Sequence, residues 1–403
     1  MTDAPTARTS LTSGFAWSFA GNAINGVSQW AILAMIAKLS STELLGEYAL
    51  AVAVAMPVAM LAHLNLRSVL ATDVRDDNPF ADYLRVRIWV ALAGFLVTTA
   101  IGLLWKPLWP VGITIVVAGA GLALENFQDL YHGMMQRRER LDLVARSMIL
   151  RSALSVSLVA AALLVYPNAV AAAAGVVAGR ALTFLLFDLP RAGNVVGQVQ
   201  APMHVFRAAL PLGLTLMLVS LTATIPRYVV EHRLGTALLG TFVAINSFVT
   251  VGSVIMNALG QSATTRLARA FSTGDFRLFR LLALRLIALA VSIGLGGALV
   301  AWVAGGFFLE LVYRPDFGQH KHLLVSMLLA GTFGYVASIL GFVVTSTRKF
   351  DEQLPLLAAV AATSGLVCLQ AMPQYGLNGA VFALAGAAIV QILGNLLILR
   401  KAL

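Results

Sequence analysis

Charged residues are scarce in this sequence. Asp, Glu, Lys and Arg make up 11% of the 403 residues, whereas 59% are hydrophobic. A soluble domain carries roughly 25% charged residues, which it needs to cover its surface. The shortage excludes a soluble fold and predicts a chain that lies mostly in lipid.

Cysteine and the familiar catalytic motifs are also missing. The single cysteine, Cys368, lies in a hydrophobic run and has no intrachain partner, which excludes a disulfide framework. The sequence has no Gly-x4-Gly-Lys-Ser/Thr phosphate loop, no Gly-x-Ser-x-Gly elbow and no His-Glu-x2-His motif. We therefore expect neither an enzyme nor a cofactor, and no metal site.

Apolar stretches of about 20 residues dominate the chain instead, and each can cross ~30 Å of hydrocarbon as a helix. The first stretch is too long for a signal peptide, so we expect a retained span after a cytoplasmic segment 1–13. The sequence predicts an all-α, polytopic membrane protein of about twelve transmembrane helices, roughly at 14–37, 45–70, 84–105, 110–134, 148–166, 168–189, 206–228, 236–263, 281–304, 323–346, 354–373 and 376–399.

Lysine and arginine are distributed unequally between the two sides of these spans. If the spans alternate, twenty basic residues fall on the side of the N-terminus and six on the other. Cytoplasmic loops carry the excess of basic residues, so both termini are expected in the cytoplasm. Nucleic acid is not an expected partner, because the arginines are spread over short loops without interleaved aromatics. Contact with membrane lipids is expected.

A short sequence repeat relates the two halves of the chain. Residues 42–48 read Thr-Glu-Leu-Leu-Gly-Glu-Tyr and residues 236–242 read Thr-Ala-Leu-Leu-Gly-Thr-Phe. Leu-Leu-Gly matches also arise by chance in membrane proteins, but both copies open the second span of their half. The repeat predicts an N-lobe, 14–200, and a C-lobe, 201–403, of six spans each, related by a parallel pseudo-repeat. Transporters of this kind place the substrate between their lobes.

Several charged residues fall within the predicted spans, where a charge is costly and is a functional candidate. The candidates are Glu125, Asp129, Arg180, Arg67 and Arg227. In one interpretation they line a hydrated cavity, where arginine binds phosphate and Glu125 carries a proton or holds an arginine. In the other, Glu125 and Arg180 form a structural ion pair within one lobe, and the remaining residues reach toward the headgroups.

The first span also carries a polar stripe. Asn22, Asn25 and Gln29 recur at spacings of three and four, so they share one helical face. Such a stripe suits the wall of a central cavity or a set of interhelical hydrogen bonds, and both readings stay open.

The sequence resembles bacterial polysaccharide repeat-unit flippases of the O-antigen, Wzx type. The resemblance is carried by residues 210–231, which include Pro226-Arg227-Tyr228, by Gln136-Arg137-Arg138-Glu139-Arg140, by Leu64-Asn65-Leu66-Arg67, and by 258–269 and 376–380. It covers essentially the whole chain.

This resemblance implies membership of the multidrug/oligosaccharidyl-lipid/polysaccharide exporter superfamily. It implies a flippase that moves a polyprenyl-diphosphate-linked oligosaccharide from the cytoplasmic to the outer leaflet of the bacterial inner membrane, for surface polysaccharide synthesis. The expected partners are the lipid-linked oligosaccharide, a polysaccharide polymerase and glycosyltransferases. Arg67, Arg180 and Arg227 are carried over as substrate-binding residues by position and neighbouring motif.

Three alternatives remain. A cation-coupled antiporter of small molecules from the same superfamily typically has a carboxylate pair in its N-lobe, and the first span has none. A sugar transporter of the major facilitator type usually has a Gly-x3-Asp-Arg loop, but residues 71–79 read differently. A membrane enzyme on lipid-linked sugars usually has a large outer loop, whereas the longest one expected here is 305–322.

Overall fold

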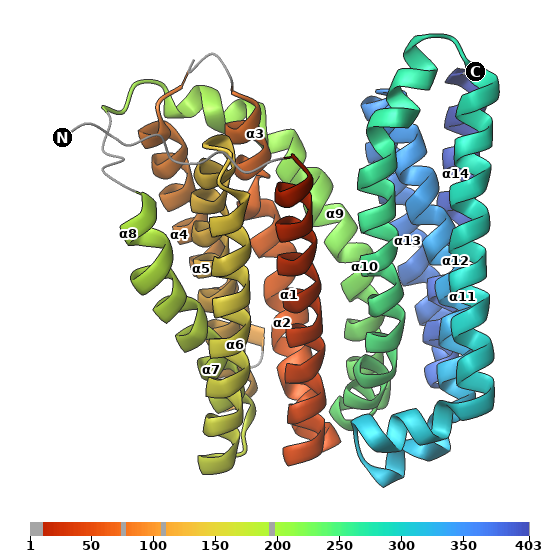
Figure 1. The fold of residues 1–403 in the computed structure, drawn as a ribbon. Coiled ribbons are helices and arrows are strands. Elements are labelled where there is room, and N and C mark those ends of the chain that lie inside the picture. Colours follow the sequence, from red (N-terminus) through yellow and green to blue (C-terminus); the bar gives the residue numbers. More distant parts are fainter. Residues whose placement is uncertain (1–10, 74–77, 106–109, 193–197, 403) are drawn as a thin grey trace. The chain divides into compact units, whose positions relative to one another are not determined.

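The computed structural model describes residues 11–73, 78–105, 110–192 and 198–402 (Figure 1). Most of the predicted segment 1–13, and with it Arg8, lies outside the described residues, as do Arg75 and Lys106. These three residues contributed to the predicted orientation.

The described chain is built from helices, which run along its length in the order α1 (Leu11–Leu39), α2 (Thr42–His63), α3 (Leu66–Thr72), α4 (Phe80–Trp105), α5 (Val111–Arg137), α6 (Leu141–Val165), α7 (Ala169–Thr183), the π-helix η1 (Phe184–Asp188), α8 (Leu189–Ala192), α9 (Pro202–Leu234), α10 (Thr236–Ser272), α11 (Phe276–Val312), the 3₁₀-helix η2 (Pro315–His320), α12 (Lys321–Ser346), α13 (Phe350–Tyr375) and α14 (Leu377–Ala402). The predicted all-α polytopic fold is confirmed.

Eleven helical segments of the described chain are long and apolar enough to cross a membrane. The helix α1 is not among them, although its 29 residues exceed the length of a span. Its polar stripe, Asn22, Asn25 and Gln29, dilutes its apolar character.

Several helices extend well beyond the apolar stretches that predicted them. The segments 264–280 and 305–322 were expected to be connecting loops, but α10 continues to Ser272 and α11 covers Phe276–Val312. The expectation was wrong because it ended each helix where hydrophobicity ended, and helix formation needs no apolar residues. Only Thr273, Gly274 and Asp275 separate the two helices, with Gly274 at a φ of 74° and the Asp275 carboxylate accepting from the Leu278 amide.

The second predicted span is interrupted near its C-terminal end. Leu64 and Asn65 have φ values of 51° and 49°, so α2 ends at His63 and α3 starts in a new direction. The buried Arg87 of α4 donates hydrogen bonds to the carbonyl oxygens of Ala62 and His63, at 2.9 and 3.0 Å. These bonds satisfy the last carbonyls of α2, which have no partner within the helix.

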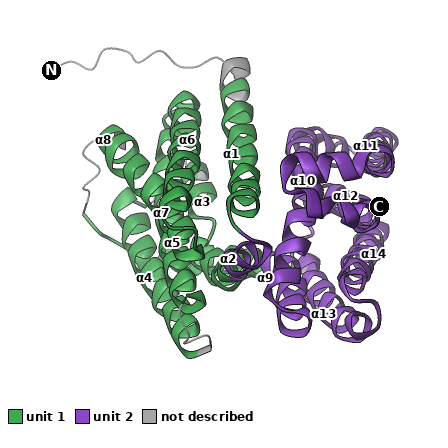
Figure 2. Cartoon of the chain, turned by 90° about the horizontal axis from the view of Figure 1, so that it is seen from below, with its two compact units in different colours: residues 1–40, 51–217 green, residues 41–50, 218–403 purple. Residues whose placement is uncertain are grey.

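The described chain divides into two compact units, coloured in Figure 2. Unit 1 comprises residues 1–40 and 51–217, and unit 2 comprises residues 41–50 and 218–403. The lobes 14–200 and 201–403 stay a prediction. The units differ from them because the start of α9 packs in unit 1 and the start of α2 packs in unit 2.

The start of α9 is held in unit 1 by a buried carboxylate and a shared core. Asp82 of α4 accepts hydrogen bonds from the backbone amides of Gln200 and Ala201, both at 2.8 Å. Val205 and Ala209 are buried in one hydrophobic cluster with Leu64, Leu66, Tyr83 and Leu130. The chain is therefore anchored to unit 1 before α9 reaches the residues of unit 2.

Within unit 2, the two copies of the sequence repeat pack against each other. A Cβ atom added to Gly46 of α2 would overlap the carbonyl oxygen of Thr236, and one added to Gly240 of α10 would overlap that of Thr42. The contact is reciprocal between equivalent positions of the two copies. Small residues allow membrane helices to approach this closely, which explains why both copies have glycine here.

Replacing Gly240 by alanine is expected to destabilise the protein by about 2 kcal/mol, because the new methyl group meets a backbone carbonyl that cannot rotate away. Thermal unfolding in detergent measures the change. Gly341→Ala is the control, since a Cβ at this α12 position meets nothing within 4 Å. Equal stability of the two variants would contradict the close helix crossing.

Candidate functional site

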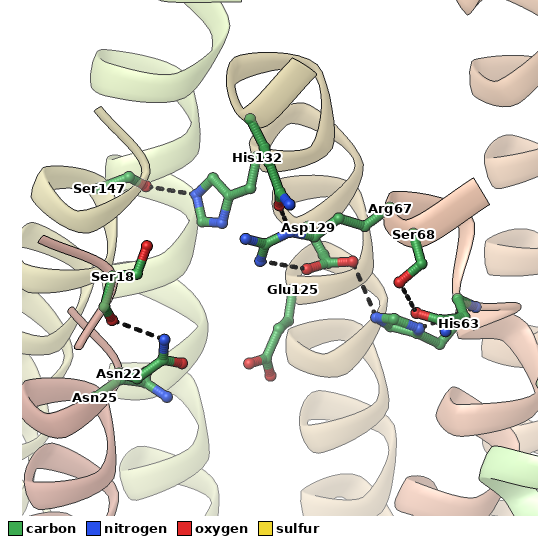
Figure 3. A network of polar contacts seen from close by, with 12 residues as sticks. Ser18, Asn22, Asn25, His63, Arg67, Ser68, Glu125, Asp129, His132 and Ser147 are labelled. Atoms are coloured by element: carbon green, nitrogen blue, oxygen red, sulfur yellow. Dashed lines mark hydrogen bonds and ion pairs between the residues drawn. The ribbon is translucent and has the colours of Figure 1, made fainter. Parts of the chain in front are cut away.

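The acidic and histidine side chains of α5 form the centre of a polar network inside unit 1 (Figure 3). Glu125, Asp129 and His132 follow one another along one face of the helix, as their spacing predicts. Each residue contacts a different set of neighbouring helices.

Glu125 is held between two arginines. Its carboxylate lies 2.6 Å from Arg180 Nη2 of α7 and 3.4 Å from Arg151 Nη1 of α6. Arg151 Nη2 also donates to Asn25 Oδ1 of α1 at 2.7 Å. Gly121, one turn before Glu125 on α5, leaves room for Arg180, since a Cβ there would lie 3.2 Å from Arg180 Nη1. Four helices thus meet around one carboxylate.

Asp129 joins α5 to the break between α2 and α3 in the second span. One carboxylate oxygen lies 3.1 Å from His63 Nε2, and the other accepts from Arg67 Nη1 at 3.2 Å. Arg67 Nε also donates to Gln136 Oε1 at 3.0 Å. The break at Leu64 and Asn65 separates His63 from Arg67, so both side chains reach the same carboxylate.

The third contact set is the most deeply buried. His132 Nε2 lies 2.9 Å from Ser147 Oγ and 3.6 Å from Asp188 Oδ1, and Asp188 is fully buried. Gln128 Nε2 donates to Asp188 Oδ2 at 3.1 Å and to the carbonyl oxygen of Arg180 at 3.2 Å. Asp188 ends the π-helix η1, a kind of helical irregularity that often occurs at functional sites.

We call these residues the α5 network: Asn25, His63, Arg67, Glu125, Gln128, Asp129, His132, Gln136, Ser147, Arg151, Arg180 and Asp188. It contains three carboxylates and three guanidinium groups, so its formal charge is zero when both histidines are neutral. Its opposite charges balance across the network as a whole, which lowers the cost of holding them inside membrane-spanning helices.

Some members of the α5 network reach the surface of unit 1. The side chains of Glu125 and Arg67 are 28% and 29% exposed, whereas that of Arg151 is 9% exposed. At these exposed fractions, a carboxylate is accessible to protons and a guanidinium group is accessible to anionic ligands. No group of three or more His, Cys, Asp and Glu residues that would suit a metal ion occurs in the part of the chain that the structure describes.

The predicted polar stripe of α1 only partly joins this network. Asn25 accepts from Arg151, and Ser28 Oγ donates to Ser152 Oγ of α6 at 3.1 Å. Asn22 is exposed and donates to the carbonyl oxygen of Ser18 in its own helix, and Gln29 is exposed as well. The packing of α1 against α6 explains the division, because it selects one edge of the stripe.

Arg227, the remaining arginine candidate, lies in the unit 2 part of α9. It is half-buried, its Nε atom has no hydrogen-bond partner, and it forms no ion pair with any residue that the structure describes. Thus Arg67 and Arg180 have carboxylate partners, whereas the charge of Arg227 is not compensated by the described side chains.

His63, Asp188 and Arg151 belong to the site although the sequence did not predict them as members. Arg151 was counted as an inner-side charge because the fifth span was expected to begin at residue 148. The helix α6 begins at Leu141, so Arg151 lies ten residues inside it and is buried. Asp142, an acidic residue in the first turn, was a signal for this earlier start.

Charged residues inside membrane-spanning helices are candidates for function, and solved proteins share the fold that holds them here. A solved multidrug resistance MATE family transporter of the MOP superfamily, in its inward-facing conformation, matches 98% of this chain and 95% of its own, with a TM-score of 0.72 and 15% identity. The lipid II flippase MurJ, in an inward closed conformation, matches 96% of this chain and 87% of its own, with a TM-score of 0.74 and 12% identity.

A curated protein matches along nearly the whole sequence. The capsular polysaccharide biosynthesis protein CapF of Staphylococcus aureus is 22% identical over 394 residues, which cover 95% of this chain and 98% of that protein. No protein-family profile matches the chain. The chain is therefore a multi-pass membrane protein with the fold of MATE transporters and MurJ.

Replacing Glu125 by glutamine is expected to lower the free energy of unfolding by about 3 kcal/mol, because Arg180 and Arg151 lose their shared carboxylate inside the protein. Unfolding in detergent, followed by circular dichroism, measures the loss. Glu352→Gln is the control, since its ion pair with the exposed Lys401 contributes about 0–1 kcal/mol. Similar stabilities of the two variants would show that Glu125 does not hold the arginines in place.

Proposed function

We propose that this protein is a flippase that moves polyprenyl-diphosphate-linked oligosaccharide repeat units from the cytoplasmic to the outer leaflet of the bacterial inner membrane. The product would serve surface polysaccharide synthesis, such as capsule, exopolysaccharide or O-antigen. The fold shared with a lipid II flippase and the likeness to a capsular polysaccharide biosynthesis protein support this proposal.

The chemistry of such a substrate fits the charges within the helices. The prenyl tail remains in lipid, while the diphosphate and the sugars must leave water. A diphosphate carries at least two negative charges, whose desolvation is the main barrier to crossing. Arginine lowers this barrier because its planar guanidinium group donates two parallel hydrogen bonds to phosphate oxygens.

The proposal depends most on the surroundings of the Arg227 guanidinium group. A half-buried guanidinium group with an unpaired Nε atom and no carboxylate partner among the described residues is poorly solvated. An anionic ligand would supply the missing partner. We therefore assign Arg227 to the diphosphate.

Arg180 and Arg67 have a different role in this proposal. Each one already holds a carboxylate, so a phosphate group must displace Glu125 or Asp129 to bind it. The carboxylates therefore neutralise the two arginines as long as no substrate is present. The released carboxylate would then be free to take up a proton, which gives the network a means of coupling transport to a proton gradient. Asn22 and Gln29, both exposed, are proposed to contact the sugars.

A second candidate is a cation-coupled antiporter of small molecules with the same fold. The partly exposed carboxylates Glu125 and Asp129, at 28% and 20%, favour it because both can exchange protons. Transport of substrates that carry no diphosphate would favour this candidate over the flippase.

The orientation proposed for this function places both termini in the cytoplasm. A polysaccharide polymerase and glycosyltransferases are its proposed partners. Single cysteines at Asp316 and at Thr273, introduced into a Cys368→Ala chain, test the orientation in intact cells with a membrane-impermeant maleimide. Only the Asp316→Cys chain is expected to react, and Thr273→Cys should react after permeabilisation. The reverse pattern would place the termini outside.

The proposed function is tested by the movement of a fluorescent polyprenyl-diphosphate oligosaccharide across proteoliposomes that contain the purified protein. Arg227→Gln is expected to slow this movement about tenfold or more, because a charge-assisted hydrogen bond contributes about 1.5–3 kcal/mol. Arg233→Gln is the matched control, since it removes the same charge from an exposed position of the same helix.

Equal rates for Arg227→Gln and Arg233→Gln would remove Arg227 from the transport path but leave the function standing. No movement with the correctly inserted wild-type protein, tested with several sugar heads, would overturn the flippase. The antiporter would then be the leading hypothesis.

A further inference from the structure

The hairpin of α10 and α11 is longer than a membrane requires. Each helix has 37 residues, which corresponds to about 55 Å at 1.5 Å per residue, whereas the hydrocarbon core is about 30 Å thick. The excess must lie outside the core at one or both ends. The basic residues Arg266, Arg269, Arg277 and Arg280 flank the turn between the helices, which places this end of the hairpin at headgroup level or beyond.

The turn lies at the end of unit 2 that also holds the C-terminus. Leu267, Ala270 and Phe279 beside the turn share a hydrophobic cluster with Leu340 of α12 and Leu399 of α14. Figure 1 shows the end of α14 close to the turn. This end therefore also carries Arg348, Lys349, Arg400 and Lys401, and it is strongly basic.

An open groove of about 480 Å³ lies along the first turns of α11. It is lined by Phe276, Arg277, Arg280, Leu281 and Leu284, and all five side chains are exposed. Phe276 comes first along the helix, the two arginines follow, and the leucines come last, with Leu284 63% exposed. Beyond the arginines, the groove is therefore apolar as the helix runs into the membrane.

The arginines of the groove are not neutralised within the protein. Neither Arg277 nor Arg280 forms an ion pair with a residue in the described ranges. The nearest carboxylate in sequence, Asp275, accepts a hydrogen bond from the Leu278 amide at 2.9 Å and so caps the helix. An anionic ligand would find two guanidinium groups three residues apart on one helical face.

We propose that this groove binds an anionic phospholipid of the surrounding leaflet. The phosphate group lies between Arg277 and Arg280, and an acyl chain runs along Leu281 and Leu284. The charge of the arginines requires a negative headgroup, and the exposed leucines require an apolar chain, so neither free phosphate nor a neutral lipid satisfies both halves. The proposal concerns a lipid bound to the outside of unit 2 and does not depend on the transported substrate.

The lipid would fix the depth of the long hairpin in the membrane. Juxtamembrane arginines attract anionic lipids even without a defined site. A defined groove adds position and headgroup selectivity, because only a lipid held there contacts both the arginines and the leucines.

Binding is measured on the purified full-length chain by native mass spectrometry, with phosphatidylglycerol and phosphatidylcholine as probes. We expect the wild type to prefer phosphatidylglycerol and Arg277→Gln/Arg280→Gln to bind it about thirtyfold more weakly, since two basic residues near anionic lipid together contribute an attraction of this order. Arg348→Gln/Lys349→Gln is the matched control, because it removes two exposed charges from the same end of unit 2. It should bind as the wild type does.

One further variant separates the sources of the phosphate group. Leu281→Gln/Leu284→Gln keeps both arginines and is expected to weaken phosphatidylglycerol binding while leaving the response to inorganic phosphate unchanged. Thermal unfolding with each ligand provides a second readout and shows that the variants are folded. None of these binding measurements involves transport, so their result is independent of the proposed flippase activity.

The proposal is overturned if the control loses as much affinity as Arg277→Gln/Arg280→Gln, because the attraction is then diffuse. It also fails if inorganic phosphate competes fully with phosphatidylglycerol, which would reduce the groove to an anion site. Stronger binding of a polyprenyl diphosphate than of phosphatidylglycerol, lost in the same variant, would make the groove a substrate site instead.

Discussion

The ion pairs of Glu125 with Arg180 and Arg151 are the constraint around which unit 1 is built. A carboxylate inside a membrane-spanning helix is costly unless a cation compensates it, and each of these arginines would be equally costly alone. Satisfying them requires α5, α6 and α7 to keep fixed distances and rotations. The hydrogen bond from Arg151 to Asn25 extends the same requirement to α1. Burial of apolar surface alone imposes no such register, because lipid is as apolar as the side chains that face it.

Local irregularities of the helices supply the remaining geometry. The break at Leu64 and Asn65 directs His63 and Arg67 toward one carboxylate, and the buried Arg87 satisfies the carbonyl groups exposed by the break. At the other side of α5, the π-helical turn that ends at Asp188 places a buried carboxylate beside His132. Each irregularity interrupts regular hydrogen bonding where a polar side chain of the α5 network needs a partner. This coincidence agrees with the proposed exchange of partners among the polar groups of the α5 network.

The arginines of this protein fall into two electrostatic classes. Arg67, Arg151 and Arg180 are balanced by carboxylates of unit 1, whereas Arg227, Arg277 and Arg280 have no ion-pair partner among the residues described. The balanced group keeps the spans stable in the absence of a ligand. The other group retains its full attraction for phosphate, which is why the diphosphate of the proposed substrate and the headgroup of a phospholipid are assigned to it.

Composition and periodicity were sufficient to determine the class of fold, because a chain with 11% charged residues and repeated apolar stretches can fold only within lipid. The spacing of Glu125, Asp129 and His132 is also enough to place them on one face, since a regular helix fixes the direction of residues four and seven apart. The ion-pair and hydrogen-bond partners of these residues could not be predicted from composition and periodicity. Arg151 and Asp188 are distant from Glu125 and His132 in sequence, and a hydropathy pattern does not record how helices rotate about their axes. Only the tertiary packing decided that rotation, because burying each charge against its counterpart depends on contacts between helices.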